Sequence, residues 1–461
     1  MSSSLETTLR SARQIPTDDA DLDTLRDVLR RARVAGADGA DAVLRRRQGL
    51  SLARRLGRTE TLERTEECEL GLRVFVGRRQ ALVATADLAP AALIATVERA
   101  MAMARVVPED PYCGLADRDL LASAFPELDI CDDTPPSEAE LERRAADAED
   151  AALAVAGVTN SEGAEASSGE DRIAFATSEG FAQARRRTSH ALSVSVLAGD
   201  GTAMQRDYEY ATATHRADLP SPADLGRSAA ERAVRRLNPR KAQTAQVPVI
   251  YDERVARGLL SHFAAAITGN SVARRTTFLN DRLGEAVFAP GIQIIDDPLR
   301  PRGPRSRAFD GEGVGTMRRA LVEDGVLQTW LLDLHSARQL GLTTTGHAVR
   351  GIASPPSPSA SNLYLAAGES TPEALYADVR NGLFVTELIG FGVNGVTGDY
   401  SRGASGFWIE NGVLGHPVSE VTISGNLLEM FRNLTPANDL VFRYGTDAPT
   451  VRVDGLTVAG R

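Results

Sequence analysis

Histidine, the residue that most often binds a catalytic metal, occurs six times in the sequence but in no metal-binding pattern. A zinc site needs three or four converging ligands, and one helix can supply two of them when two histidines lie four residues apart. No two histidines have that spacing, and no H-E-x-x-H occurs. Ligands far apart in the sequence could still meet in the folded chain, so a dispersed site stays open. The six are His190, His215, His262, His335, His347 and His416.

Two glycine-rich segments partly match motifs that hold a nucleophile or a phosphate. Residues 403–406 (G-A-S-G) begin like a nucleophile elbow, but Phe407 stands at the last glycine position. Residues 390–395 match G-x-G-x-x-G after a strand-like run. A dinucleotide site also needs a helix there, and residues 396–400 are not typical of a helix. We therefore predict a glycine-rich turn in both segments.

Composition and charge restrict the class of protein. The 461 residues carry a net charge of -10, which disfavours a nucleic-acid binder because that class needs basic surface. We interpret the clusters 45–47 and 185–187, each of three arginines, as solvated edges of strands or turns. The three cysteines lack C-x-x-C spacing, so neither a disulfide framework nor a thiolate zinc site is indicated.

The sequence also predicts a cytoplasmic protein with no membrane contact. Met1 to Arg10 contain no apolar segment of the kind found in secretory signals. No stretch approaches the roughly 18 uninterrupted apolar residues that a membrane-spanning helix needs.

The order of predicted elements indicates the α+β class: an N-terminal α+β region of two subdomains, then a β-rich C-terminal domain with short helices. We place the two subdomains at residues 1–105 and 106–240, and the C-terminal domain at 246–461, after a polar boundary. Apolar residues between Leu22 and Ala32 recur at helical spacing, and those between Leu70 and Val76 alternate as in a strand.

Local signals place further elements. Ser137 with Glu140 predicts a capping box at the start of a helix, and the turns 323–325 and 411–412 predict β-hairpins. The other expected elements are strands at 172–176 and 191–197, and helices at 222–237, 334–340 and 427–433.

Longer stretches resemble a known family. They are FDGEGVGTMRRALVEDGVLQTWLLDLHSARQLGLTTTGHA from Phe309 to Ala348, GDYSRGASGFWIENGVLGHPVSEVTISGN from Gly398 to Asn426 and, in the N-terminal half, LGLRVFVG, TADL and MQRDYEY. On these motifs the sequence resembles the TldD/PmbA family, and within it the TldE/PmbA branch, from about residue 20 onward. The resemblance implies a cytoplasmic peptidase of two related chains, whose name as a modulator of DNA gyrase reflects gyrase-targeting peptides and toxins rather than direct contact with DNA.

The sequence departs from the family where the metal would bind. In the TldD branch, the resemblance implies a helix with H-E-x-x-x-H, in which two histidines bind zinc and the glutamate activates water, and a later cysteine ligand. The matching segment here, LLSHFAAAITGN, places Ser261 at the first histidine, His262 at the glutamate and Ala266 at the second histidine. No cysteine follows Cys131. We therefore predict no catalytic residue and no zinc in this chain, and expect zinc in a partner subunit.

The resemblance further implies a TldD-like metallopeptidase subunit as the partner, and unfolded or small modified peptides as substrates. Glycine-rich loops and β edges suit such substrates, because an extended peptide can bind as an added strand. Residues of the strongest motifs are candidates for lining a peptide channel, with a structural role in a turn as the alternative. They are His347, Asp399, Tyr400, Ser401 and Arg402.

Two other functions stay open at this point. The chain could be a stand-alone hydrolase with a non-standard metal site, or a peptide-binding regulatory protein with no enzyme partner. A homodimer of the lone chain is also compatible with the sequence.

Overall fold

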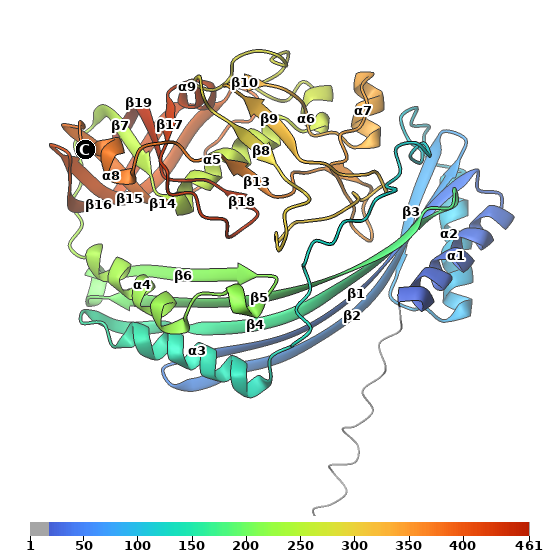
Figure 1. Ribbon diagram of the computed structural model, residues 1–461, viewed down its shortest axis with the longest axis horizontal. Helices are drawn as coiled ribbons and strands as arrows, with labels where there is room; N and C mark the ends of the chain where they lie inside the picture. Colours follow the sequence, from blue (N-terminus) through green and yellow to red (C-terminus); the bar gives the residue numbers. More distant parts are fainter. Residues whose placement is uncertain (1–17, 461) are drawn as a thin grey trace, which may run out of the picture.

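A computed structural model describes residues 18–460 and confirms the predicted α+β class. A long curved N-terminal sheet faces a β-rich C-terminal domain (Figure 1). Met1 to Arg10, on which the prediction of no secretory signal rests, lie outside the described residues. Within residues 18–460, no helix has the length and apolar character needed to cross a membrane.

The N-terminal sheet has six antiparallel strands in the order β3-β2-β1-β4-β5-β6. Because β1 pairs with β4 over 14 residues of each strand, one sheet runs through both predicted N-terminal subdomains. The strands are β1 (Gly39–Arg55), β2 (Arg58–Val76), β3 (Arg79–Thr85), β4 (Val158–Thr177), β5 (Ala182–Ala198) and β6 (Gln205–Ala213).

Two of these strands are much longer than the sequence predicted. The expected strands at 172–176 and 191–197 form only the ends of β4 and β5. Residues 165–171 of β4 are small or charged and mostly half-buried, so they lack the alternation of apolar and polar residues that marks a strand in the sequence.

Two pairs of helices cover the sheet on the side away from the C-terminal domain (Figure 1). Helices α1 (Asp18–Val34) and α2 (Pro90–Ala104) pack at one end, and α3 (Glu138–Leu153) and α4 (Pro222–Arg235) at the other. Ser137 caps α3 by accepting a hydrogen bond from the backbone nitrogen of Glu140 at 3.2 Å, which is half of the predicted capping box. The Glu140 carboxylate accepts instead from Arg216 at 2.8 Å.

The C-terminal domain contains a small closed barrel. Its strands pair in the order β16-β15-β14-β7-β19, and β16 pairs back onto β19. A second sheet has the order β10-β9-β8-β13-β18. The barrel strands are β7 (Ala245–Tyr251), β14 (Asn381–Ile389), β15 (Asp399–Glu410), β16 (Val413–Asn426) and β19 (Val451–Ala459), with β17 (Leu434–Pro436) beside β19.

Short strands and helices complete this domain. The strands are β8 (Ile294–Asp296), β9 (Arg319–Glu323), β10 (Val326–Leu327), β11 (Ala348–Val349), β12 (Ser357–Pro358), β13 (Leu363–Leu365) and β18 (Thr446–Asp447). The helices are α5 (Glu253–Ala266), α6 (Gly269–Ala273), α7 (Leu334–Leu340), α8 (Pro372–Tyr376) and α9 (Leu427–Arg432).

Turns in the C-terminal domain test the glycine predictions. Both predicted hairpins are present, and Asn411 and Gly412 each have the positive φ that a tight two-residue turn requires. Residues 390–395 connect β14 to β15 and do not open a helix, as predicted. The predicted turn at 403–406 is wrong, because these residues lie inside β15. Glycine is needed there for close packing: a Cβ at Gly406 would lie 1.9 Å from the carbonyl oxygen of Phe384.

Candidate functional site

Helix α5 carries the three positions that the family resemblance aligns with a zinc-binding helix. Asp252 caps its start by accepting a hydrogen bond from the nitrogen of Arg254 at 3.0 Å. Ala266 is 6% exposed and packs in the core of the C-terminal domain. Ser261 is exposed, and its hydroxyl donates to the carbonyl oxygen of Arg257 at 3.1 Å. The aligned segment is therefore a helix, in which Ala266 serves packing and Ser261 forms a local hydrogen bond.

The surroundings of His262 are unfavourable for a cation. Its ring meets the ring of Tyr400 edge-on, with centroids 6.2 Å apart. Burial lowers the pKa of His262, and the positive charge of Arg402 lowers that pKa further. Burial also raises the pKa of Tyr400 to about 12, so its phenol stays neutral.

These residues do not fit a zinc centre. Ala266 has no donor atom. The positive charge of Arg402 lowers the pKa of His262, and the same charge would repel a metal cation bound there. Across residues 18–460, no group of three or more histidine, cysteine or acidic side chains is placed to hold a metal ion.

The effect of Arg402 on His262 can be measured directly. We expect Arg402→Gln to raise the pKa of His262 toward its ordinary value, because the substitution removes a nearby positive charge. The pKa should stay below the ordinary value, since burial remains. An NMR titration of the imidazole protons would report the change, with Arg275→Gln as the control because Arg275 lies on the exposed surface, paired with Asp281. An unchanged His262 titration in Arg402→Gln would contradict this account.

A cleft of about 400 Å³ lies beside residues 254–261 of α5, between the N-terminal sheet and the C-terminal domain. Its lining includes β6, α5, β14 and β15, together with residues next to β18. Ser261 and Arg402 both line this cleft, so it adjoins the positions where the resemblance places zinc ligands in the other branch. We call it the arginine cleft because five arginines line it: Arg236, Arg254, Arg257, Arg305 and Arg402.

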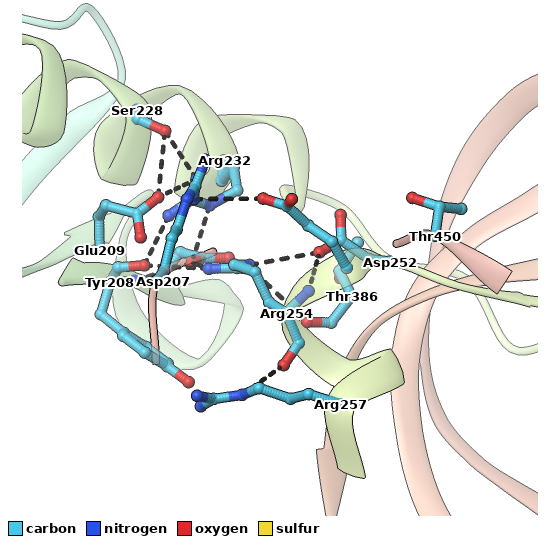
Figure 2. Close-up of polar contacts among 12 residues, drawn as sticks. Asp207, Tyr208, Glu209, Ser228, Arg232, Asp252, Arg254, Arg257, Thr386 and Thr450 are labelled. Carbon is cyan, nitrogen blue, oxygen red and sulfur yellow. Dashed lines mark hydrogen bonds and ion pairs between the residues drawn. The ribbon is translucent and has the colours of Figure 1, made fainter. Parts of the chain in front are cut away.

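A buried carboxylate organises one wall of the arginine cleft (Figure 2). Asp207 is 2% exposed and accepts hydrogen bonds from Arg232 at 3.3 Å and Arg254 at 3.2 Å. Arg236 lies 3.3 Å from its other oxygen and also pairs with Glu387. Burial alone would raise the pKa of Asp207, but the arginines hold it below its usual range. Asp207 therefore stays ionised and fixes the positions of these guanidinium groups.

The predicted channel residues fall in three different places. Arg402 lines the arginine cleft, and Tyr400 is buried behind it against His262. Ser401 and Asp399 are exposed near the start of β15, where Asp399 accepts a hydrogen bond from the Thr397 hydroxyl at 2.6 Å.

His347 lies apart from the arginine cleft. It is 2% exposed, and its ring nitrogens lie 3.2 Å from Asp296 Oδ2 and 2.8 Å from Thr345 Oγ1. Both nitrogens thus have partners inside the C-terminal domain. Whether any of the five candidates contacts a peptide stays a prediction.

Sequence reasoning missed most of the arginine cleft. The motif MQRDYEY contains Asp207, Tyr208 and Tyr210, which line it, so a signal was present. The arginines come from four separate stretches of the chain, and no spacing rule brings them together.

Comparison with known proteins agrees with the resemblance. Three family models match the chain: PmbA/TldA metallopeptidase domain 1 over residues 40–104, the central domain over 131–237 and the C-terminal domain over 244–460. The metalloprotease PmbA of Escherichia coli O157:H7 is 40% identical over 92% of this chain and 93% of its own length. The chain belongs to the PmbA/TldD metallopeptidase family. A protein from Bacteroides thetaiotaomicron, described as a candidate modulator of DNA gyrase, has a solved structure with a TM-score of 0.89 and 26% identity, covering 96% of this chain and 99% of that one.

Two family members from Haemophilus influenzae differ in their similarity to this chain. Its PmbA homologue is 38% identical over 92% of this chain and 93% of its own length. Its TldD homologue is 28% identical over 44% of this chain and 46% of its own length. The chain is thus more similar to the PmbA homologue of that organism.

Proposed function

We propose that this chain is the non-catalytic, TldE/PmbA-type subunit of a two-chain metallopeptidase that acts on unfolded or small modified peptides. A TldD-like partner supplies the zinc. The observation that carries the proposal is the side-chain set on and beside α5. Ser261 and Ala266 stand at the aligned histidine positions, and Arg402 places a positive charge beside His262.

The comparisons support the branch assignment. Similarity to the Haemophilus influenzae PmbA homologue covers almost the whole chain, whereas similarity to the TldD homologue covers less than half. A chain with the family fold but without the metal ligands suits the role of a partner subunit. Such a subunit must present a surface and a channel, but it need not hold a metal.

The test is to measure zinc content and peptidase activity for the full-length chain, for a TldD-like chain of the same organism, and for the two mixed. We expect the chain alone to be zinc-free and inactive, and the mixture to hold one zinc per pair and to cleave unfolded peptides. His262→Gln in this chain should leave zinc content and activity of the mixture unchanged, because His262 has no part in the proposed metal site.

Each other outcome points to a different function. Stoichiometric zinc and cleavage by the chain alone would show a stand-alone hydrolase. Failure to associate with any TldD-like chain would instead favour a peptide-binding regulatory protein. Loss of zinc from the mixture on His262→Gln would also contradict the proposal.

A further inference from the structure

Three arginines of the arginine cleft have no carboxylate partner among residues 18–460. Arg257 donates to the Tyr210 hydroxyl at 2.5 Å, and Arg305 donates to the Thr446 hydroxyl at 3.2 Å. Arg402 donates to the carbonyl oxygen of Ile389 at 3.3 Å. Each guanidinium is anchored by a neutral oxygen, so its positive charge is not compensated.

The other two arginines of the cleft are neutralised. Asp207 contacts both Arg236 and Arg254, and Glu387 also contacts Arg236. Among residues 18–460, these two carboxylates are the only acidic side chains that line the cleft. Five arginines therefore face two carboxylates, and the cleft has an excess of positive charge in a chain whose net charge is -10.

Tyrosine side chains form a wall next to the unpaired charges. The rings of Tyr210 and Tyr444 lie 4.8 Å apart, and the guanidinium carbon of Arg257 lies 4.2 Å from the centroid of Tyr444. Stacking on aromatic rings holds a guanidinium in place and leaves its outer edge free to donate hydrogen bonds. The wall offers apolar surface to a side chain next to a bound anion.

We propose that the arginine cleft binds a carboxylate, and that its ligand is the C-terminal carboxylate of a peptide. Arg257, Arg305 and Arg402 supply the charge, since the guanidinium fork matches the two oxygens of a carboxylate. The cavity of about 400 Å³ is large enough for the last residues of a peptide, whose final side chain packs on the tyrosines. The choice of a peptide rests on the proposed function. It deepens that function by giving this chain a substrate-binding role: it holds the end of a peptide while the partner cleaves.

The test measures binding to the full-length chain by isothermal titration calorimetry at low salt. Three probes separate the sources of a carboxylate: pentaalanine with a free C-terminus, the same peptide as its C-terminal amide, and an N-acetylated, C-terminally amidated pentapeptide with one internal glutamate. We expect the free acid to bind at least roughly tenfold more tightly than either amide, and its affinity to fall as salt rises.

Two substitutions place the effect in the cleft. Arg402→Gln and Arg305→Gln should each weaken binding of the free acid about tenfold and leave the amide unchanged. Arg402 is half-buried, and its substitution could disturb folding. Arg305 is exposed, so Arg305→Gln tests the cleft without that complication. Arg275→Gln is the matched control, because Arg275 pairs with Asp281 on the surface and does not line the cleft.

Equal affinity for the free acid and its amide would overturn the proposal. An equal loss of affinity for the free acid in the two cleft variants and in the Arg275→Gln control would also overturn it. Binding of the internal-glutamate peptide as tight as that of the free acid would overturn the assignment to a C-terminus. These measurements use the chain without a partner. If it prefers the free acid but pairs with no TldD-like chain, the proposed subunit role fails and the carboxylate site stands.

Discussion

Asp41→Ala is expected to lower the free energy of unfolding by about 3–5 kcal/mol, because it leaves buried positive charges without their partner. Asp41 is fully buried in β1 and accepts a hydrogen bond from Arg73 Nε at 2.9 Å. Its other carboxylate oxygen contacts Arg350 of the C-terminal domain. Burial alone would raise the pKa of Asp41, but the two arginines hold it below its usual range, so it is charged.

The loss of the Asp41 carboxylate should also weaken the contact between the N-terminal sheet and the C-terminal domain. Two buried nitrogens of Arg350, Nε and Nη2, have no hydrogen-bond partner in the described part of the chain, so Asp41 is its main compensation. Urea unfolding followed by circular dichroism would measure the effect, with Asp23→Ala as the matched control. Asp23 pairs with Arg26 on the exposed face of α1, and its loss should cost no more than about 0.5 kcal/mol. Similar losses in the two variants would contradict this reading of the buried pair.

The sequence predicted best where local patterns decide the structure. Helix α1 buries Leu22, Leu25, Val28, Leu29 and Ala32, which are the residues that fall at helical spacing. Helix α7 spans Leu334–Leu340 as predicted, and the turn at 411–412 has the expected backbone. Caps, turns and amphipathic periodicity act over a few residues, so they can be read without knowing the rest of the fold.

The sequence predicted least where contacts join distant segments. The arginines at 185–187 were expected to be solvated, but Arg187 donates to the carbonyl oxygen of Pro304 at 2.8 Å, across to the C-terminal domain. Burial lowers the pKa of Arg185, which stacks on Phe309. Nothing local to a run of arginines shows which surface will cover them.

The candidate site shows the same division. The sequence and a family resemblance were enough to see that Ser261 and Ala266 stand at the aligned histidine positions on α5. The arginine cleft could not, because it forms where β6 of the N-terminal sheet meets α5, β14 and β15. Two motifs pointed to parts of its lining: the one that carries Asp207 and Tyr208, and the one that carries Arg402.

Glu312 lies in the same buried charge cluster as Asp41, and it should make stability depend on pH. Its carboxyl group accepts a hydrogen bond from the Leu334 nitrogen at 2.8 Å and lies 3.8 Å from Arg73. Burial raises the pKa of Glu312 from an ordinary 4.5 to about 8, more than Arg73 lowers it. Asp310, whose pKa burial also raises, lies next to it and adds to the cost of a second charge.

We expect Glu312→Gln to stabilise the chain increasingly as pH rises from about 5 to about 8. In this window the unfolded chain has lost the Glu312 proton while the folded chain keeps it, so rising pH favours unfolding of the wild type. Glutamine is neutral at every pH and can still accept from Leu334. At roughly 1.4 kcal/mol per pKa unit, the shift from 4.5 to about 8 gives the variant an advantage of the order of 4 kcal/mol near pH 8, and the advantage should vanish as the pH falls below 4.5. Urea unfolding at several pH values would measure it, with the exposed Glu285→Gln as the control. A variant that is equally stable or less stable at pH 8 would show that Glu312 is ionised in the folded chain and held by Arg73.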